Sequence, residues 1–160
     1  IKRIEDPVLL AFSTSSSEAA FPKTMIELEK FGCKDKIVSF VLPLGYSFNL
    51  DGSMMYMTFA SLFIAQSYGI HLDFGTQISM LLVLMLTSKG IAGVPRASLV
   101  VIAGTLGTFN IPEAGLALLL GIDPLLDMGR SATNVVGNSI ATAVVSKWEG
   151  ALGEEQEDIM

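Results

Sequence analysis

The feature that most limits the fold of this chain is a long apolar run that is interrupted at its centre. Apolar residues dominate 37–49 and again 54–68, and the polar stretch Asn49-Leu50-Asp51-Gly52-Ser53 separates them. Neither part reaches the roughly 20 apolar residues that a bilayer-spanning helix needs, whereas the two together do. An Asp at mid-membrane costs on the order of 2.5–3.5 kcal/mol unless the chain unwinds there around a ligand. We therefore predict a discontinuous helix over about 37–69, whose freed oxygens hold a cation.

The composition also indicates a membrane protein. Apolar residues make up 51% of the 160 residues and charged residues only 16%, against roughly 25% charged in soluble domains. Much of the net charge of −6 comes from 151–160, which we interpret as an acidic, solvated tail. Nucleic acid is therefore not expected as a partner. One cysteine, Cys33, and one histidine, His71, cannot form an intrachain disulfide or a Cys- or His-based metal site, and no cofactor is expected.

A polar stripe follows one face of the last predicted helix. Its members, at spacings of three, four, seven and eleven residues, are Asp127, Arg130, Ser131, Asn134 and Asn138. At about 100° per residue they share one narrow face, and the other faces are apolar. This pattern predicts a buried stripe that binds a ligand. The alternative is an Asp127–Arg130 pair that satisfies itself on an exposed face, worth a few tenths of a kcal/mol.

Two other segments are predicted to be helical hairpins whose arms are too short to span a membrane. The first, 1–33, turns at a serine-rich stretch in which Ser15 and Glu18 have the spacing of a capping box. The second, 74–110, turns at the Gly- and Pro-rich stretch 89–96, where glycines allow backbone to approach a ligand closely. A helix that is polar at mid-depth follows each hairpin. This weak internal repeat is typical of inverted-repeat transporters.

The positive charges indicate an orientation. Neither 69–75 nor 110–115 contains Lys or Arg, whereas the opposite ends of the predicted helices carry Lys2, Arg3, Lys30, Lys34, Lys36 and Lys147. By the positive-inside rule, the first hairpin opens from the cytoplasm and the second from outside. We therefore expect the two turns to meet near the midplane, against the polar stripe and the broken helix, with the C-terminus in the cytoplasm.

Four motifs, in this order and spacing, resemble the dicarboxylate/amino acid:cation symporters, the family that includes the glutamate transporters. The motifs are Ser15-Ser16-Ser17, Asn49-Leu50-Asp51-Gly52-Ser53, Gly90-Ile91-Ala92-Gly93-Val94-Pro95 and Asp127-Met128-Gly129-Arg130-Ser131-Ala132-Thr133-Asn134. The resemblance covers nearly the whole chain. It implies an all-α membrane protein of the cell membrane, a homotrimer in which a mobile transport domain slides past a fixed scaffold.

Within that fold, the resemblance makes 1–150 the C-terminal part of the transport domain. It implies two re-entrant helical hairpins and two discontinuous transmembrane helices. The corresponding segments are hairpin 1–33, broken helix 37–69, hairpin 74–110 and last helix 113–148, followed by the cytoplasmic tail 151–160. We interpret the last helix as a pair of segments, 113–126 and 128–148, with the boundary at Asp127.

The resemblance also assigns substrate contacts. It gives Arg130 to the side-chain carboxylate of the substrate and Asp127 to its α-ammonium. The other expected substrate residues are Ser16, Ser17, Ser53, Val94, Ser131 and Asn134. Elementary chemistry agrees, because Arg offers a bidentate fork to a carboxylate and the helix N-termini at the hairpin turns favour an anion.

Cation ligands follow from the same resemblance, largely through backbone oxygens: Gly45, Ser47, Asn49, Asp51, Ser88, Asn134 and Asn138. Asn138 stands where sodium-coupled members carry Asp, and Lys89 and Ile91 lie at hairpin positions near another sodium. The coupling ion is therefore expected to be the proton and/or sodium. Met57 replaces a Glu that animal members use in potassium countertransport, so potassium antiport is not expected.

The predicted function is secondary active symport of glutamate or aspartate into the cell, and not enzymatic catalysis. One alternative is a C4-dicarboxylate:cation symporter for succinate, malate or fumarate. A distant alternative is a membrane hydrolase that pairs Ser15, Ser16 or Ser17 with Lys89, although this leaves the broken helix and the polar stripe unexplained.

Overall fold

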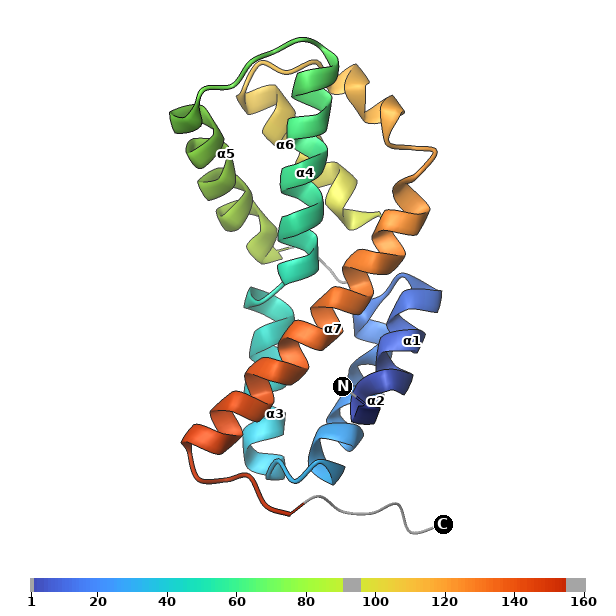
Figure 1. The fold of residues 1–160 in the computed structure, drawn as a ribbon, viewed down its shortest axis with the longest axis vertical. Coiled ribbons are helices and arrows are strands. Elements are labelled where there is room, and N and C mark those ends of the chain that lie inside the picture. The colour runs from blue at the N-terminus through green and yellow to red at the C-terminus, as the bar shows by residue number, and fades with distance from the viewer. Residues whose placement is uncertain (1, 91–95, 155–160) are drawn as a thin grey trace.

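The computed structural model describes residues 2–90 and 96–154, and in these ranges the chain consists of helices joined by short turns, without β-strands (Figure 1). This confirms the all-α prediction for the described residues. The elements are η1 Lys2–Ile4, α1 Glu5–Thr14, α2 Ser17–Lys30, α3 Asp35–Phe48, α4 Asp51–Ser67, α5 Phe74–Thr87, η2 Ser88–Gly90, α6 Ala97–Thr108, η3 Glu113–Leu118 and α7 Asp123–Trp148. No helix in the described ranges combines the length and the apolar character needed to cross a membrane.

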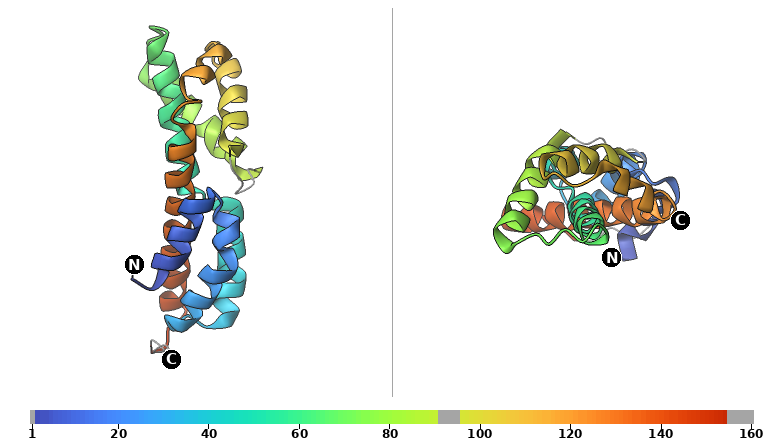
Figure 2. Two further views of the ribbon diagram at one scale, coloured as in Figure 1. Left: turned by 90° about the vertical axis from the view of Figure 1, so that its right-hand side faces the viewer. Right: turned by 90° about the horizontal axis from the view of Figure 1, so that it is seen from above.

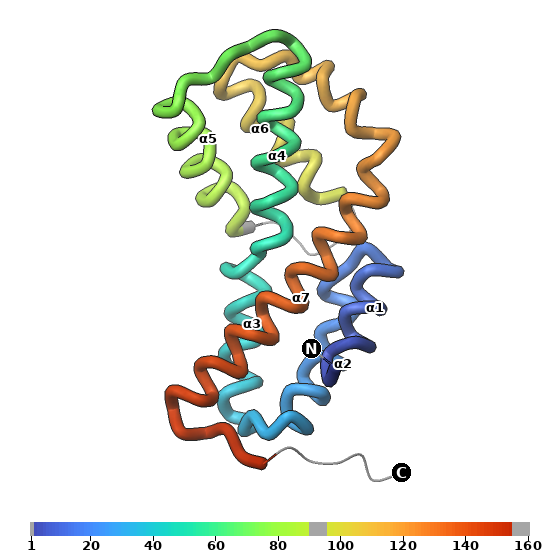
Figure 3. The backbone as a smooth tube through the Cα atoms, in the orientation of Figure 1, coloured from blue at the N-terminus to red at the C-terminus, as the bar shows by residue number. Residues whose placement is uncertain are grey.

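Helix α7 is the longest helix, and α1, α2, α3 and α4 pack against it. It runs diagonally along the molecule, with α1, α2 and α3 beside one half and α4 beside the other (Figures 1 and 3). Helices α5 and α6 pack on α4 and on each other. The upper core lies among α4, α5 and α6 and includes Met57, Ile64, Leu84 and Ile102, all fully buried.

The two helical hairpins approach the middle of the molecule from opposite ends (Figures 1 and 2). In the first, Ser15 ends α1 in the left-handed conformation, with φ of 52°. Ser16 then caps α2, because its Oγ accepts the Ala19 N–H at 3.2 Å. The predicted cap was Ser15, so that assignment was wrong by one residue. Ser15 ends α1 in the left-handed conformation, and Ser16 therefore takes the N-cap position of α2.

The broken apolar segment forms two helices, because α3 ends at Phe48 and α4 begins at Asp51. The segment 113–148 is also interrupted, between η3 and the start of α7. Helix α7 begins at Asp123, four residues before Asp127, whereas the sequence suggested a boundary at Asp127. Pro124 explains the earlier start, since proline is favoured in the first turn of a helix.

The beginning of the C-terminal tail is attached to the loop after α2. Cys33 and Leu152 form an isolated antiparallel bridge. The Lys34 N–H donates to Ala151 O at 3.2 Å, and the Gly153 N–H donates to Gly32 O at 2.8 Å. The start of the predicted solvated tail, 151–160, is therefore an ordered contact, and residues 155–160 lie outside the described residues.

Candidate functional site

Asp127 and Arg130 form a buried ion pair one turn apart on α7. Arg130 Nε lies 2.5 Å from Asp127 Oδ1, and the two side chains are 0% and 1% exposed for arginine and aspartate respectively. The pair satisfies itself, as the alternative interpretation proposed, but it is not on an exposed face. A buried pair gains little net stability, and removing one partner costs about 3–5 kcal/mol. Both charges therefore depend on each other, or on a ligand that replaces the partner.

Ser53 and Asn134 connect the beginning of α4 to this pair. Asn134 Oδ1 accepts the N–H groups of Gly52 and Ser53 at 2.9 and 3.3 Å. Ser53 Oγ accepts from Asn134 Nδ2 at 3.1 Å and from Arg130 Nη1 at 3.2 Å. The first N–H groups of a helix have no partner inside it, and no side chain at Leu50 caps α4. Asn134 supplies that cap from α7, and thereby places Ser53 beside Arg130.

Glycines allow α3 and α4 to lie directly on α7. A Cβ on Gly52 would overlap the Arg130 carbonyl oxygen, and a Cβ on Gly45 would lie 2.5 Å from Asn138 Oδ1. A Cβ on Gly137 would overlap the carboxylate of Asp51. These close approaches bring the break between α3 and α4 against the polar stripe.

Several of the predicted cation ligands gather at this break. Asn49 Nδ2 donates to Asn138 Oδ1 at 3.2 Å, beside Gly45, and Asp51 lies against Gly137. The Asn138 Nδ2 atom is buried and has no hydrogen-bond partner among the described residues. Within the described part of the chain, no three His, Cys, Asp or Glu side chains gather to hold a metal. The side chains that gather at the break offer amide oxygens and one carboxylate.

Two predicted cation ligands have other contacts. Ser47 is exposed, and its Oγ donates to Pro43 O at 3.3 Å within α3. Ser88 is buried, and its Oγ donates to Met85 O at 3.0 Å. No contact in the described structure joins either hydroxyl to the stripe.

The second hairpin contacts the site from both sides of its turn. The Arg96 N–H donates to Asp127 Oδ2 at 2.9 Å, so both carboxylate oxygens of Asp127 are engaged. Lys89 Nζ donates to Phe48 O at 2.6 Å, at the end of α3. The predicted substrate residue Val94 and the nearby Ile91 lie outside the described residues.

The first hairpin and α7 each contribute a buried hydroxyl group. Ser17 and Ser131 are both 0% exposed, and neither Oγ has a hydrogen-bond partner among the described residues. Both hydroxyls are therefore available for a hydrogen bond to a ligand. Ser16 Oγ, by contrast, caps α2. Since Lys89 contacts Phe48, the described contacts do not form the Ser–Lys pair of the hydrolase alternative.

The sequence interpretation missed two residues beside the stripe. The Tyr56 hydroxyl donates to Asp123 Oδ1 at 2.5 Å, and Asp123 is 1% exposed. Asp123 lies one turn before Asp127 and therefore continues the same helical face. It was overlooked because the helix was expected to begin near Asp127, and this spacing of four was the signal that could have found it.

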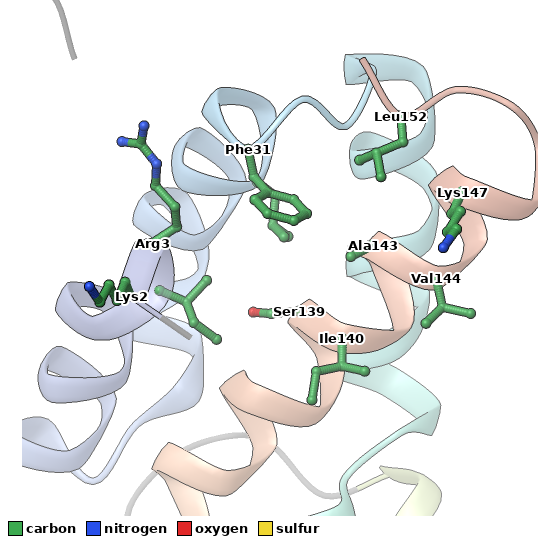
Figure 4. A pocket seen from close by; sticks show the side chains of 11 residues that line it. Lys2, Arg3, Phe31, Ser139, Ile140, Ala143, Val144, Lys147 and Leu152 are labelled. Carbon is green, nitrogen blue, oxygen red and sulfur yellow. The ribbon is translucent and has the colours of Figure 1, made fainter. Parts of the chain in front are cut away.

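A separate groove of about 640 Å³ opens along the other half of α7 (Figure 4). Apolar side chains such as Phe31 and Ile140 line it, with Lys2, Arg3 and Lys147 also along its walls. None of the predicted site residues that the structure describes is part of its lining. The candidate site is therefore defined by buried contacts of α7 with α4 and Arg96, and not by this open groove.

Comparison with known proteins found a matching family model and several similar proteins. The model of the sodium:dicarboxylate symporter family matches residues 1–148. The chain is 58% identical over 156 residues to a proton/sodium-glutamate symport protein of Bacillus caldotenax, covering 98% of this chain and 37% of that protein. It is 54% identical over 157 residues to a C4-dicarboxylate transport protein of Agrobacterium fabrum, covering 98% and 35%.

A third relative is a proton/glutamate-aspartate symporter of Escherichia coli, 52% identical over 149 residues, covering 93% of this chain and 34% of that protein. The chain thus spans about a third of the length of these relatives.

Proposed function

The chain belongs to the sodium:dicarboxylate symporter family, and on that premise we propose that it is the C-terminal part of the transport domain of a secondary active symporter. The whole protein carries glutamate or aspartate into the cell together with protons and/or sodium. It works in the cell membrane as a homotrimer, by elevator-type alternating access. The two helical hairpins are its re-entrant segments, and the C-terminus is cytoplasmic.

The observation that carries this proposal is the buried contact between Asp127 and Arg130. An acidic amino acid offers an ammonium to the acid and a carboxylate to the guanidinium, so it can replace the contact on both sides. Ser53 accepts hydrogen bonds from both Asn134 and Arg130, so these two neutral side chains, Ser53 and Asn134, stand beside the pair as hydrogen-bonding groups. The unpartnered hydroxyls of Ser17 and Ser131 supply further donors to the same substrate.

The exposed apolar side chains support a membrane setting. Phe40, Phe59, Phe74, Leu86 and Val100 are between 68% and 79% exposed. Large apolar surfaces mark contact with a membrane or with other protein surface. In the whole symporter, lipid and the remaining transmembrane helices cover them.

The break between α3 and α4 is the proposed cation site. Asn49, Asp51 and Asn138 meet there, and backbone oxygens complete the set, those of the break and those of Ser47 and Ser88. Because Asn138 offers a neutral oxygen, sodium is held less firmly than by a carboxylate, which favours a role for protons.

Uptake by the full-length protein in proteoliposomes tests the proposal. Labelled aspartate, glutamate and succinate are compared under imposed sodium or proton gradients. We expect accumulation of the two amino acids, driven by one or both gradients. Absence of cation-driven uptake of any acidic substrate would refute the proposal.

The second candidate function is C4-dicarboxylate:cation symport. It is favoured by the 54% identity to a C4-dicarboxylate transport protein. Asp127 argues against it, because succinate brings no ammonium and would bury two like charges together. Succinate uptake equal to that of aspartate would make this the main function.

A further inference from the structure

We infer that Asp123 is a proton-binding group of the symport cycle, paired with Tyr56. The inference rests on the proposed function, because it assigns one coupling ion to one residue of this chain. Asp123 is 1% exposed. Helices of this chain already cover the Asp123 side chain. Further parts of a longer protein would not expose it.

The charges around Asp123 are not balanced by buried partners. Among the described residues, the buried charged side chains are Asp123, Asp127 and Arg130. Arg130 is bound directly to Asp127, which also accepts the Arg96 N–H. Two buried carboxylates therefore share one buried guanidinium, and Asp127 makes the direct contact with it. Asp123 is therefore the carboxylate without direct contact to a buried positive charge among the described residues.

The contacts of Asp123 leave one oxygen available. The Tyr56 hydroxyl donates to Oδ1 at 2.5 Å. Oδ2 is buried and has no hydrogen-bond partner among the described residues. Its nearest described cation is Arg96 Nε at 3.7 Å, on a side chain that is 63% exposed. A proton on Oδ2 neutralises the carboxyl group in place, whereas a solvent-screened guanidinium beyond hydrogen-bond distance does so only weakly.

Among the described residues, the titratable and charged groups around Asp123 come from α4, α6 and α7. Helix α4 presents Tyr56, the N-terminal end of α6 presents Arg96, and α7 itself adds Asp127 and Arg130. The acid of η3, Glu113, lies against Gly107 toward the far end of α6. Asp123 is therefore the acid in this group whose charge can change without breaking the Asp127–Arg130 contact.

Substrate binding explains why the charge would change. With both acids ionised, the two acids and two arginines of this group are neutral together. An acidic amino acid adds one net negative charge, and one proton at Asp123 restores neutrality. The proton is bound when the substrate is bound and is released when the substrate leaves, which is the requirement for symport.

The test uses the full-length symporter in proteoliposomes with two measurements, glutamate uptake driven by a proton gradient and glutamate–glutamate exchange without a gradient. For Asp123→Asn, we expect exchange to be retained and the response to the proton gradient to be lost. Asp73→Asn is the matched control, since Asp73 is an exposed acid at the start of α5. It is expected to leave both measurements unchanged.

A second variant gives a result even if Asp123→Asn fails to fold. Tyr56→Phe removes the hydrogen bond to the Asp123 carboxylate, so the pH dependence of uptake should shift. Tyr68→Phe, at a half-exposed tyrosine, should not move it. The inference is overturned if Asp123→Asn keeps its gradient response, or if neither Asp123→Asn nor Tyr56→Phe alters the pH dependence. If wild-type protein shows no uptake at all, both the proposed function and the inference about Asp123 are refuted.

Discussion

Arg130 Nε lies 2.5 Å from Asp127 Oδ1, and both side chains are buried. The two groups neutralise each other in the absence of a ligand. Any ligand that binds one of them must therefore also satisfy the other, or leave a buried charge without a partner. The proposed substrate, an acidic amino acid, meets this requirement because it carries both an ammonium and a carboxylate.

The first prediction concerns Asp127 as the ammonium ligand. Asp127→Asn should lower aspartate affinity at least tenfold, or about 1.4 kcal/mol, because a neutral amide cannot pair with the ammonium. Succinate binding should change little. Competition of each substrate against labelled aspartate, in the full-length protein, measures both effects. Asp35→Asn, at an exposed acid at the start of α3, is the control. Unchanged aspartate affinity would show that Asp127 is not the ammonium ligand.

The second prediction concerns Asn138 and the coupling ion. Asn138→Asp places a carboxylate beside Asn49 at the helix break, so uptake should depend more steeply on sodium. The measurement is the rate of glutamate uptake against sodium concentration at constant pH. Asn110→Asp, at an exposed turn before η3, should leave the curve unchanged. A wild-type protein that already needs more than one sodium per substrate, with no response to a proton gradient, would contradict the proton-coupled interpretation.

The third prediction concerns the contact between α4 and α7. Gly52→Ala introduces a Cβ that overlaps the Arg130 carbonyl, so the helices must separate at the site. Overpacking of this kind costs about 1–3 kcal/mol, and it should lower both the thermal unfolding midpoint and the uptake rate. Gly129→Ala is the matched control, because nothing lies within 4 Å of a Cβ at that position. Equal effects of the two variants would show that close packing at Gly52 is not required.

The fourth prediction concerns Cys33, in the loop that the C-terminal tail covers. Burial raises the pKa of the Cys33 thiol, so at pH 7 less of it is thiolate than for an ordinary thiol. Its reaction with maleimide should be slow at pH 7. The reaction rate should rise as the pH is raised above about 8.5, the ordinary pKa of a cysteine thiol. Mass spectrometry of the labelled peptide follows the reaction.

A truncation after Gly150 tests the cause, because it removes Leu152, which bridges to Cys33. The thiol should then react faster at every pH. An exposed cysteine created by Ser39→Cys in a Cys33→Ser background gives the reference rate, since Ser39 is exposed. Equal rates for Cys33 and the reference would contradict the burial.

Much of the fold follows from local patterns in the sequence. Apolar periodicity and turn residues act over a few positions, and they predicted helices, two hairpins and a break near Asp51. The same periodicity placed Asp127, Arg130 and Asn134 on one helical face, and the structure brings these three together with Ser53. Local reasoning was weakest at boundaries, where it put the α2 cap at Ser15 and a helix boundary near Asp127.

Contacts between distant residues were decided only by the tertiary structure. Asn134 caps α4 across 82 positions of sequence, and Tyr56 bonds Asp123 across 67. The attachment of Leu152 to Cys33 is of the same kind. A sequence pattern indicates which face of a helix is polar, because side-chain direction follows from the helical repeat. It does not indicate which helix will cover that face, because this depends on where glycines such as Gly52 allow two backbones to approach, and on which buried polar groups then find a partner.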